Sequence, residues 1–176
     1  FFESITSELV QTSLNDLDGL SAHTKNLVDN YLNNFDSAIP RGIEVSPVIA
    51  DLVLKNFDKT ISTNDNVFYY SRFVDDIIII TSSIEKKKEF TKILSKGLPK
   101  GLIFNHNKKK IIDVKKRSKS GDNTSGRIVA DFEFLGYQFQ AIDTFLDTSS
   151  NPRSKPELAQ FRLVKVELSR NKIKKF

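Results

Sequence analysis

The chain is 176 residues long and carries a formal net charge of +5 at pH 7, which favours a polyanionic partner such as nucleic acid. It has no cysteine and only two histidines, so disulfides, thiolate metal sites and multi-histidine zinc sites are excluded, and any metal must be a hard cation held by carboxylates. The longest purely apolar run spans only residues 77–80 and no secretory signal opens the chain, so we expect a cytoplasmic protein without a membrane partner.

Apolar residues at helical spacing predict three helices in the first third of the chain. The first covers residues 4–20, and the second runs from an N-cap at Ser21 to about residue 35. After a loop over 38–45, Ser46 is predicted to be the N-cap of a third helix, with Pro47 at the first helical position. The residues predicted to be buried on the second and third helices are Leu27, Val28, Tyr31, Leu32, Val48, Ile49, Leu52, Val53 and Phe57.

Aromatic and β-branched residues predict two strands over 67–74 and 77–81, joined by a tight hairpin at Asp75 and Asp76. The four isoleucines of 77–80 predict a strand that is buried on both faces. A capping-box pattern over 82–85 predicts a helix that ends near Gly97.

The rest of the chain predicts short strands and a basic loop. Strands are expected over 102–104, 111–114, 132–139 with a tight turn at Gly136, and 163–168, where Ser169 follows as the cap of a last helix. The stretch 115–127 is basic and rich in serine and glycine, which predicts a loop. The fold class is therefore α+β, with an antiparallel sheet under helices.

Asp75 and Asp76 are unusual because they stand between two apolar strands. A solvated turn is one interpretation, since aspartate is a common turn residue. The other is a metal site, because Mg²⁺ suits a carboxylate pair together with substrate phosphates.

Five segments, in order, resemble the motifs of reverse transcriptases. Tyr-Ser-Arg-Phe-Val-Asp-Asp at 70–76 resembles the aromatic-x-Asp-Asp hairpin, and 39–52 resembles the loop and helix beneath the incoming nucleotide. Residues 102–108 resemble the Leu-Asn-x-x-Lys segment, 134–137 match the Phe-Leu-Gly-Tyr turn, and 1–5 resemble the tail of the first catalytic motif. The resemblance implies the palm of a right-hand polymerase, with the catalytic hairpin backed by helices.

In that family, two Mg²⁺ ions support nucleotidyl transfer, with Mn²⁺ as an alternative. The resemblance implies that Asp75 is a direct metal ligand and Asp76 its weaker partner. The third carboxylate is expected a few residues before Phe1. Glu3 does not replace it, because it follows the aromatic pair instead of preceding it.

The resemblance also assigns nucleotide-binding positions. Phe2 falls where an aromatic ring excludes the ribose 2′-hydroxyl, although it could simply be a core residue. Gly42 and Ser46 belong to the loop and helix under the incoming nucleotide. Arg41 stands where many relatives carry glutamine; it could hold a phosphate or the template backbone, or be a solvated surface arginine.

The remaining assignments concern the leaving group and the primer. Lys108 aligns with a lysine proposed as the general acid to pyrophosphate, although it also opens a run of three lysines. Leu135, Gly136 and Tyr137 form the turn that grips the primer, or a plain turn with a packed tyrosine. The basic stretches 115–127 and 153–175 are either phosphate contacts or solvated.

The chain has no methionine and opens on Phe1 and Phe2, so we expect a piece of a longer protein. Residues 1–150 would be a palm that begins after the first catalytic aspartate, and 151–176 the start of a thumb. This stretch alone is expected to be inactive.

The leading hypothesis for function is DNA synthesis on an RNA template. Pro-Arg-Gly at 40–42 and Arg-x-Val-Asp-Asp at 72–76 resemble the abortive-infection and defence-associated branch of prokaryotes. The expected partners are an RNA template, a DNA primer or product, deoxynucleoside triphosphates and accessory defence proteins. Two alternatives stay open: template-independent or protein-primed DNA synthesis, and a maturase-like nucleic-acid-binding scaffold without activity.

Overall fold

The computed structural model describes residues 4–34, 39–40, 42–82, 87–114, 126–146 and 159–173. The chain divides into two compact units, Phe1–Asn107 and Lys108–Phe176. Each unit is described by itself.

Two short helices open the first unit. Helix α1 spans Ser7–Asn15, with the side chain of Thr6 as its N-cap, and α2 spans Ala22–Leu32. The predicted cap of α2 is confirmed, because the Ser21 hydroxyl accepts a hydrogen bond from the Thr24 amide at 3.1 Å. The first helix is shorter than predicted, since it ends at Asn15 and the chain turns before Gly19. The prediction for Leu27 was wrong: this side chain is exposed, whereas Leu32 is buried.

Helix α3 spans Val45–Ser62 and is the longest element of the unit. The prediction of Ser46 as its N-cap was wrong, because Glu44 occupies that position without a side-chain hydrogen bond. Ser46 instead lies inside the first turn, fully buried. The predicted apolar face is rotated by a fraction of a turn. Its buried residues are Ser46, Ile49, Ala50, Val53, Leu54, Phe57 and Ile61, whereas Val48 is exposed.

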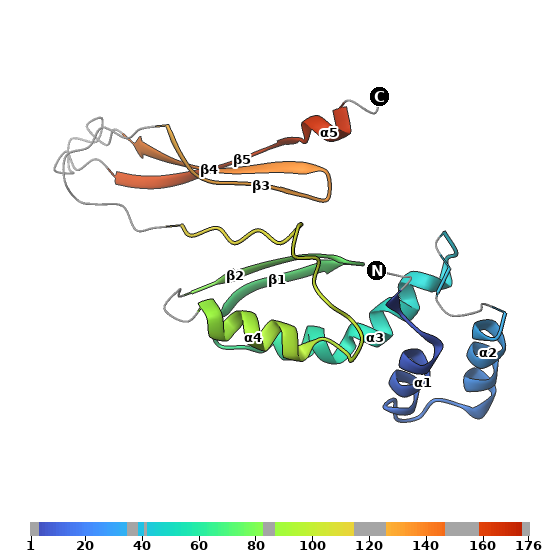
Figure 1. Cartoon of the computed structure of the whole chain (residues 1–176). Helices are drawn as coiled ribbons and strands as arrows, with labels where there is room; N and C mark the ends of the chain where they lie inside the picture. Colours follow the sequence, from blue (N-terminus) through green and yellow to red (C-terminus); the bar gives the residue numbers. More distant parts are fainter. Residues whose placement is uncertain are drawn as a thin grey trace. The chain divides into compact units, whose positions relative to one another are not determined.

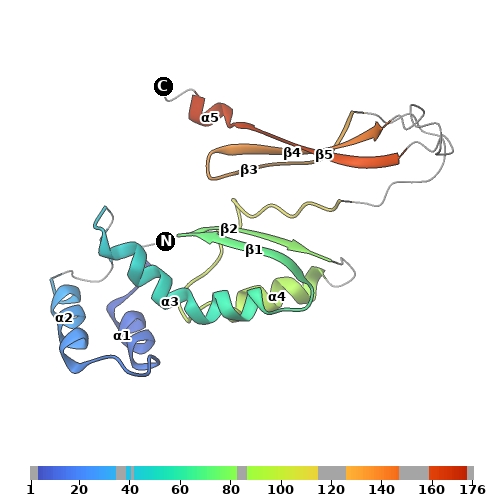
Figure 2. The same cartoon turned by 180° about the vertical axis from the view of Figure 1, so that it is seen from behind.

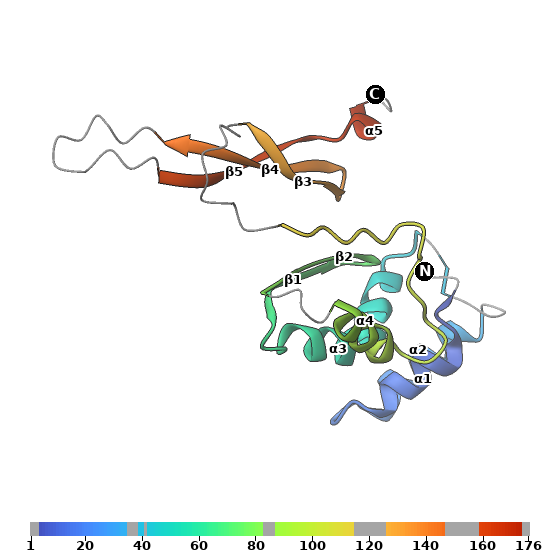
Figure 3. The same cartoon turned by 60° about the vertical axis from the view of Figure 1, so that its left-hand side comes forward.

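A two-stranded antiparallel sheet packs against this helix. Strand β1 spans Val67–Phe73 and β2 spans Asp76–Thr81. Helix α4, Lys87–Gly97, lies with α3 on one face of the hairpin (Figure 1). Figure 3 shows the same two helices beneath the strands from another side. Helix α4 ends at Gly97 as predicted, whereas the predicted capping box lies largely outside the described residues.

The hydrophobic core of the unit is centred on α3. Phe57 is fully buried, with ring centroids 6.4 Å from Tyr70 on β1 and 6.2 Å from Phe104. Ile77 and Ile79 of β2 pack against the same core. Ile80 is half exposed, so the prediction of a strand buried on both faces was wrong at that residue.

The segment that joins the units is extended but contains no assigned strand over the described residues 102–114. The predicted strands at 102–104 and 111–114 were therefore wrong. Leu102 is nonetheless buried and Phe104 packs on the core. The apolar residues of this segment fill the core without a strand partner.

The second unit contains a three-stranded antiparallel sheet in the order β3-β4-β5. The strands span Arg127–Phe134, Tyr137–Leu146 and Ala159–Leu168, and the short helix α5 follows at Arg170–Ile173. Figure 2 shows α5 continuing directly from the end of β5. Register pairs Phe139 with Phe132 on one side and Val166 on the other. The two phenylalanine rings stack with centroids 5.3 Å apart.

The α+β class is confirmed, although in the part of the chain that the structure describes the strands form two sheets and not one. The turn predicted at Gly136 is present, with longer strands on both sides than the sequence predicted. The domain boundary predicted at residue 150 stays a prediction; it falls outside the described residues, between β4 and β5, which pair with each other. Among the described residues, no helix is long and apolar enough to cross a membrane.

The burial pattern of α3 generates a stability prediction. Phe57→Ala removes a fully buried ring from between α3, β1 and Phe104, and we expect a loss of about 3–5 kcal/mol in the free energy of unfolding. The matched control on the same helix is Val48→Ala, at an exposed position, where we expect less than about 0.5 kcal/mol. Urea unfolding followed by circular dichroism measures both. Comparable losses would contradict the observed face of α3.

Candidate active site

The turn between β1 and β2 carries the two predicted metal ligands. Phe73 pairs with Asp76, so the two turn residues are Val74 and Asp75. Asp76 is therefore the first residue of β2 and not a turn residue, which shifts the predicted hairpin by one position. Both aspartates are exposed. The turn thus presents two adjacent carboxylates to solvent at one end of the hairpin. The helix-facing side of the same hairpin is packed on the core.

The turn contains an unfavourable backbone conformation. Val74 has a φ of 56°, in the left-handed region that β-branched residues rarely adopt. Such a conformation costs about 1–3 kcal/mol and persists only where the surrounding structure enforces it. The structure must therefore contain interactions that hold this turn.

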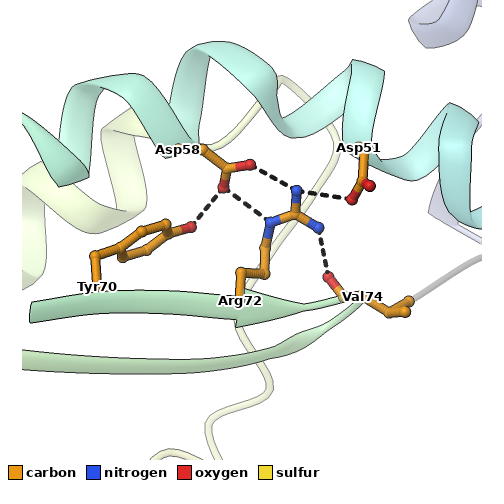
Figure 4. Close-up of polar contacts among 5 residues, drawn as sticks. All are labelled: Asp51, Asp58, Tyr70, Arg72 and Val74. Atoms are coloured by element: carbon orange, nitrogen blue, oxygen red, sulfur yellow. Dashed lines mark hydrogen bonds and ion pairs between the residues drawn. The ribbon is translucent and has the colours of Figure 1, made fainter.

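Arg72 provides such an interaction. Its guanidinium donates from Nε and Nη2 to the two carboxylate oxygens of Asp58, at 2.8 and 2.6 Å. Nη2 also lies 3.0 Å from a carboxylate oxygen of Asp51, and Nη1 donates to the Val74 carbonyl at 3.0 Å. Figure 4 shows these contacts between α3 and the hairpin. Arg72 therefore joins two positions of α3 to the turn between β1 and β2.

Tyr70 completes the cluster from the same face of β1. Its hydroxyl donates to Asp58 at 2.5 Å. Burial, followed by the neighbouring Asp58 carboxylate, raises the pKa of Tyr70 well above its ordinary value. The hydrogen bonds to Asp58 raise the pKa of Arg72 further, against the opposing effect of burial. Both groups are thus protonated over the whole physiological range, and the cluster stays intact.

This cluster arises from the periodicities of the two elements that form it. Tyr70 and Arg72 are two residues apart on a strand, so both side chains face α3. Asp51 and Asp58 are seven residues apart on a helix, so both lie on one side of it. Sequence reasoning used Arg72 only as a family marker and missed the cluster. The available signal was the presence of charged residues on faces that are otherwise apolar.

The donor atoms of the turn suit a hard cation. Carboxylate oxygens are the ligands that Mg²⁺ prefers, and this ion commonly uses one or two carboxylates and completes its shell with water and phosphates. The described residues contain no group of three or more His, Cys, Asp or Glu side chains that could hold a metal ion. Asp75 and Asp76 provide two carboxylates, which is a number that Mg²⁺ commonly uses when water and phosphates supply its other ligands. Their assignment as ligands stays a prediction.

The predicted nucleotide-binding loop precedes α3. The Ser46 hydroxyl donates to the Pro40 carbonyl at 2.7 Å, which ties this loop to the first turn of the helix. The Ile39 amide donates to the Ile5 carbonyl at 3.3 Å, so the loop is also fixed to the segment before α1. Gly42 is exposed, with a φ of 79°. Phe2 and Arg41 lie outside the described residues.

The other predicted site residues belong to the second unit. Lys108 is exposed at its start. Leu135 and Gly136 form the β3–β4 turn, both with positive φ, at 51° and 80°, as a type I′ hairpin turn requires. The Lys172 amine lies 5.4 Å from the centre of the Tyr137 ring, and the Ser169 amide donates to the Gly136 carbonyl at 2.9 Å. A basic side chain from α5 therefore lies at the predicted primer-binding turn.

A comparison with protein families matches residues 14–139 to the family described as reverse transcriptase (RNA-dependent DNA polymerase). This match covers most of the chain and includes the hairpin, α3 and the β3–β4 turn. The chain therefore belongs to the reverse transcriptase family, and membership implies nucleotidyl transfer with nucleic acid and nucleotides as substrates. Neither the curated proteins nor the solved structures contain a significant match.

The raised pKa of Tyr70 predicts how stability depends on pH. In the unfolded chain the tyrosine hydroxyl has a pKa near 10, whereas the folded protein keeps this proton at higher pH. The free energy of unfolding therefore falls as the pH rises from about 10 toward the pKa of the folded state. Tyr70→Phe removes this part of the fall. Urea unfolding at neutral pH and at about pH 11 measures it. The control Tyr69→Phe, on the other face of β1, leaves Tyr70 and Asp58 together, so the fall should remain. An unchanged fall in Tyr70→Phe would contradict the assignment.

The β3–β4 turn predicts a second effect on stability. A Cβ at Gly136 would lie 2.7 Å from Lys172 Cδ, whereas one at Gly126 would meet no atom within 4 Å, and both residues have positive φ. Gly126→Ala should cost about 1–2 kcal/mol from the backbone conformation alone. Gly136→Ala should cost about the same 1–2 kcal/mol, because the atoms that it meets belong to the far end of the flexible Lys172 side chain, which can move away. Unfolding by urea measures both variants, and a clearly larger loss for Gly136→Ala would contradict this expectation.

Proposed function

We propose that this protein synthesises DNA on an RNA template by two-metal nucleotidyl transfer, with Asp75 and Asp76 as metal ligands, in a prokaryotic antiviral system. Membership of the reverse transcriptase family supports the polymerase activity. The observation that carries the proposal for the site is the exposed aspartate pair on a turn that Arg72 fastens to α3. A turn held in one conformation keeps the two carboxylates in place, as a metal site requires.

In the proposed reaction, the primer 3′-oxygen attacks the α-phosphorus of a deoxynucleoside triphosphate, and the bond to pyrophosphate breaks. Bound Mg²⁺ would activate the hydroxyl and neutralise the charge on the leaving group. Asp75 contributes a carboxylate from the tip of the turn, and Asp76 contributes the weaker one from the start of β2. The hairpin holds both carboxylates because its helix-facing side is packed on α3.

The other predicted residues receive roles in the same reaction. The loop before α3, with Arg41 and Gly42, binds the incoming nucleotide, and Ser46 supports it through its hydrogen bond to Pro40. Phe2 excludes the ribose hydroxyl. Lys108 protonates pyrophosphate as it leaves, which requires a charged amine near the phosphates.

The Leu135, Gly136 and Tyr137 turn contacts the primer backbone. Its type I′ geometry exposes the Tyr137 ring and the backbone of the turn, with the Lys172 amine nearby. A lysine at this position favours a phosphate. The partners that we propose for the whole reaction are an RNA template, a DNA primer and accessory defence proteins. We propose the cytoplasm as its location.

An incorporation assay with the full-length protein, an RNA template and a DNA primer tests the proposed function. Asp75→Asn should lower the rate by more than about 100-fold, beyond the loss typical of residues that only orient a metal ligand. Asp76→Asn should lower it by less. The matched control is Asp65→Asn, because Asp65 is an exposed carboxylate at the opposite end of β1, and it should leave the rate unchanged.

Each alternative has its own signature in this assay. Activity that survives the double substitution of Asp75 and Asp76 would overturn the site. Products formed without RNA would replace the proposal by template-independent synthesis. An absence of incorporation under every condition would favour a nucleic-acid-binding scaffold.

A further inference from the structure

Arg72 is a buried charged residue for which the proposed reaction has no direct use. Only 7% of its side chain is exposed, and it lies on the helix-facing side of β1, two residues before Val74. Removing an arginine from water is unfavourable unless its charge and its donors are satisfied. Here Asp58 and the Val74 carbonyl satisfy them. The question is what this arrangement does for the turn.

The planar shape of the guanidinium transmits position from α3 to the turn. Two of its nitrogens are held by the two oxygens of Asp58. Because the group is rigid, this pairing also fixes the direction of its third nitrogen, Nη1, which donates to Val74. A lysine has one ammonium at the end of a flexible chain and cannot make this fork. Replacing Arg72 by lysine would therefore keep the positive charge but lose the paired geometry of the guanidinium.

The Val74 carbonyl belongs to the peptide group that joins Val74 to Asp75. Fixing its oxygen therefore fixes the plane from which the Asp75 backbone continues. Val74 also has a strained φ of 56°, so the turn has a tendency to relax when this hydrogen bond is lost. Relaxation would rotate Asp75 and Asp76 relative to the rest of the hairpin.

We propose that Arg72 is a positioning residue for nucleotidyl transfer: its fork with Asp58 holds the turn in the conformation that directs Asp75 toward the metal. The inference rests on the proposed function, in which Asp75 is a metal ligand. Tyr70 supports the same carboxylate of Asp58. Asp51 is largely exposed, with 68% of its side chain in contact with solvent, so its ion pair is screened and contributes less.

Arg72→Lys and Asp58→Asn test the fork in the full-length protein, because each retains size and polarity while breaking the paired geometry. The matched control is Ile61→Val, which destabilises the same helix through a fully buried apolar residue that takes no part in the hydrogen bonds of the cluster. Rates of incorporation are measured against deoxynucleotide concentration and against Mn²⁺ concentration. Urea unfolding of each variant gives the stability with which its rate is compared.

We expect Arg72→Lys to lower kcat by about 100-fold, the scale of a misplacement of about 1 Å in a catalytic group. The KM for the deoxynucleotide should change little, because the defect lies in the reacting geometry, and half-saturation should require more Mn²⁺. Ile61→Val should lower stability but not kcat. The double variant Arg72→Lys, Asp58→Asn should have a kcat no lower than that of the less active single variant, because the two substitutions break the same paired unit.

The outcomes separate this inference from the proposed function. Normal kcat and normal Mn²⁺ dependence in Arg72→Lys and Asp58→Asn, with an active parent protein, would overturn the role of Arg72 alone. A loss of activity that merely follows the loss of stability, as defined by Ile61→Val, would do the same.

If the parent protein itself incorporates nothing, the proposed function fails. Amide hydrogen exchange over residues 67–81 then still tests whether the Arg72 fork holds the turn. Faster exchange at the turn in Arg72→Lys than in Ile61→Val supports it, and equal exchange overturns it.

Discussion

The ion pair between Arg72 and Asp58 is the constraint on which the hairpin of β1 and β2 depends. A buried guanidinium must be paired, and the pairing fixes the register between α3 and β1 at one point. From that point the same group reaches the Val74 carbonyl and holds a backbone conformation that valine does not favour. Apolar side chains around Phe57 pack the helix and the hairpin together. They do not specify the direction of the turn, whereas the arginine fork does.

The residues that stabilise the unit are different from those that carry the proposed chemistry. The core residues of α3 and the helix-facing side of the hairpin are buried, whereas Asp75 and Asp76 are exposed at the end of the strands. Two adjacent carboxylates repel each other, and a cation would relieve that repulsion. Metal binding at this pair, as proposed, would require no rearrangement of the core. In the second unit, the rings of Phe132 and Phe139 stack between β3 and β4, and Leu135 and Tyr137 at the turn are exposed.

The sequence predicted the elements with strong periodicity and failed where tertiary contacts decide. The hairpin, the cap at Ser21 and the end of α4 at Gly97 follow from local patterns. The turn was misplaced by one residue, because no local rule places valine at a positive φ. Ser46 has the composition of an N-cap, yet its hydroxyl bonds to Pro40 from within the helix. Leu102 and Phe104 alternate like a strand but pack on the core without one. Asp58 carried no motif at all, and only its position opposite Arg72 reveals its role.

Asp75 is proposed to hold the catalytic metal on a turn that Arg72 fixes. The most direct test is a crystal structure of the full-length protein with primer, RNA template, a non-hydrolysable deoxynucleoside triphosphate and Mn²⁺. Anomalous scattering locates the manganese without reference to any expected ligand. We expect an anomalous peak at a coordination distance from the Asp75 carboxylate close to the ~2.0–2.1 Å of Mg²⁺, with the Arg72 fork still joined to Asp58 and Val74. A peak held by other residues, or a turn that has released Arg72 in the complex, would contradict it.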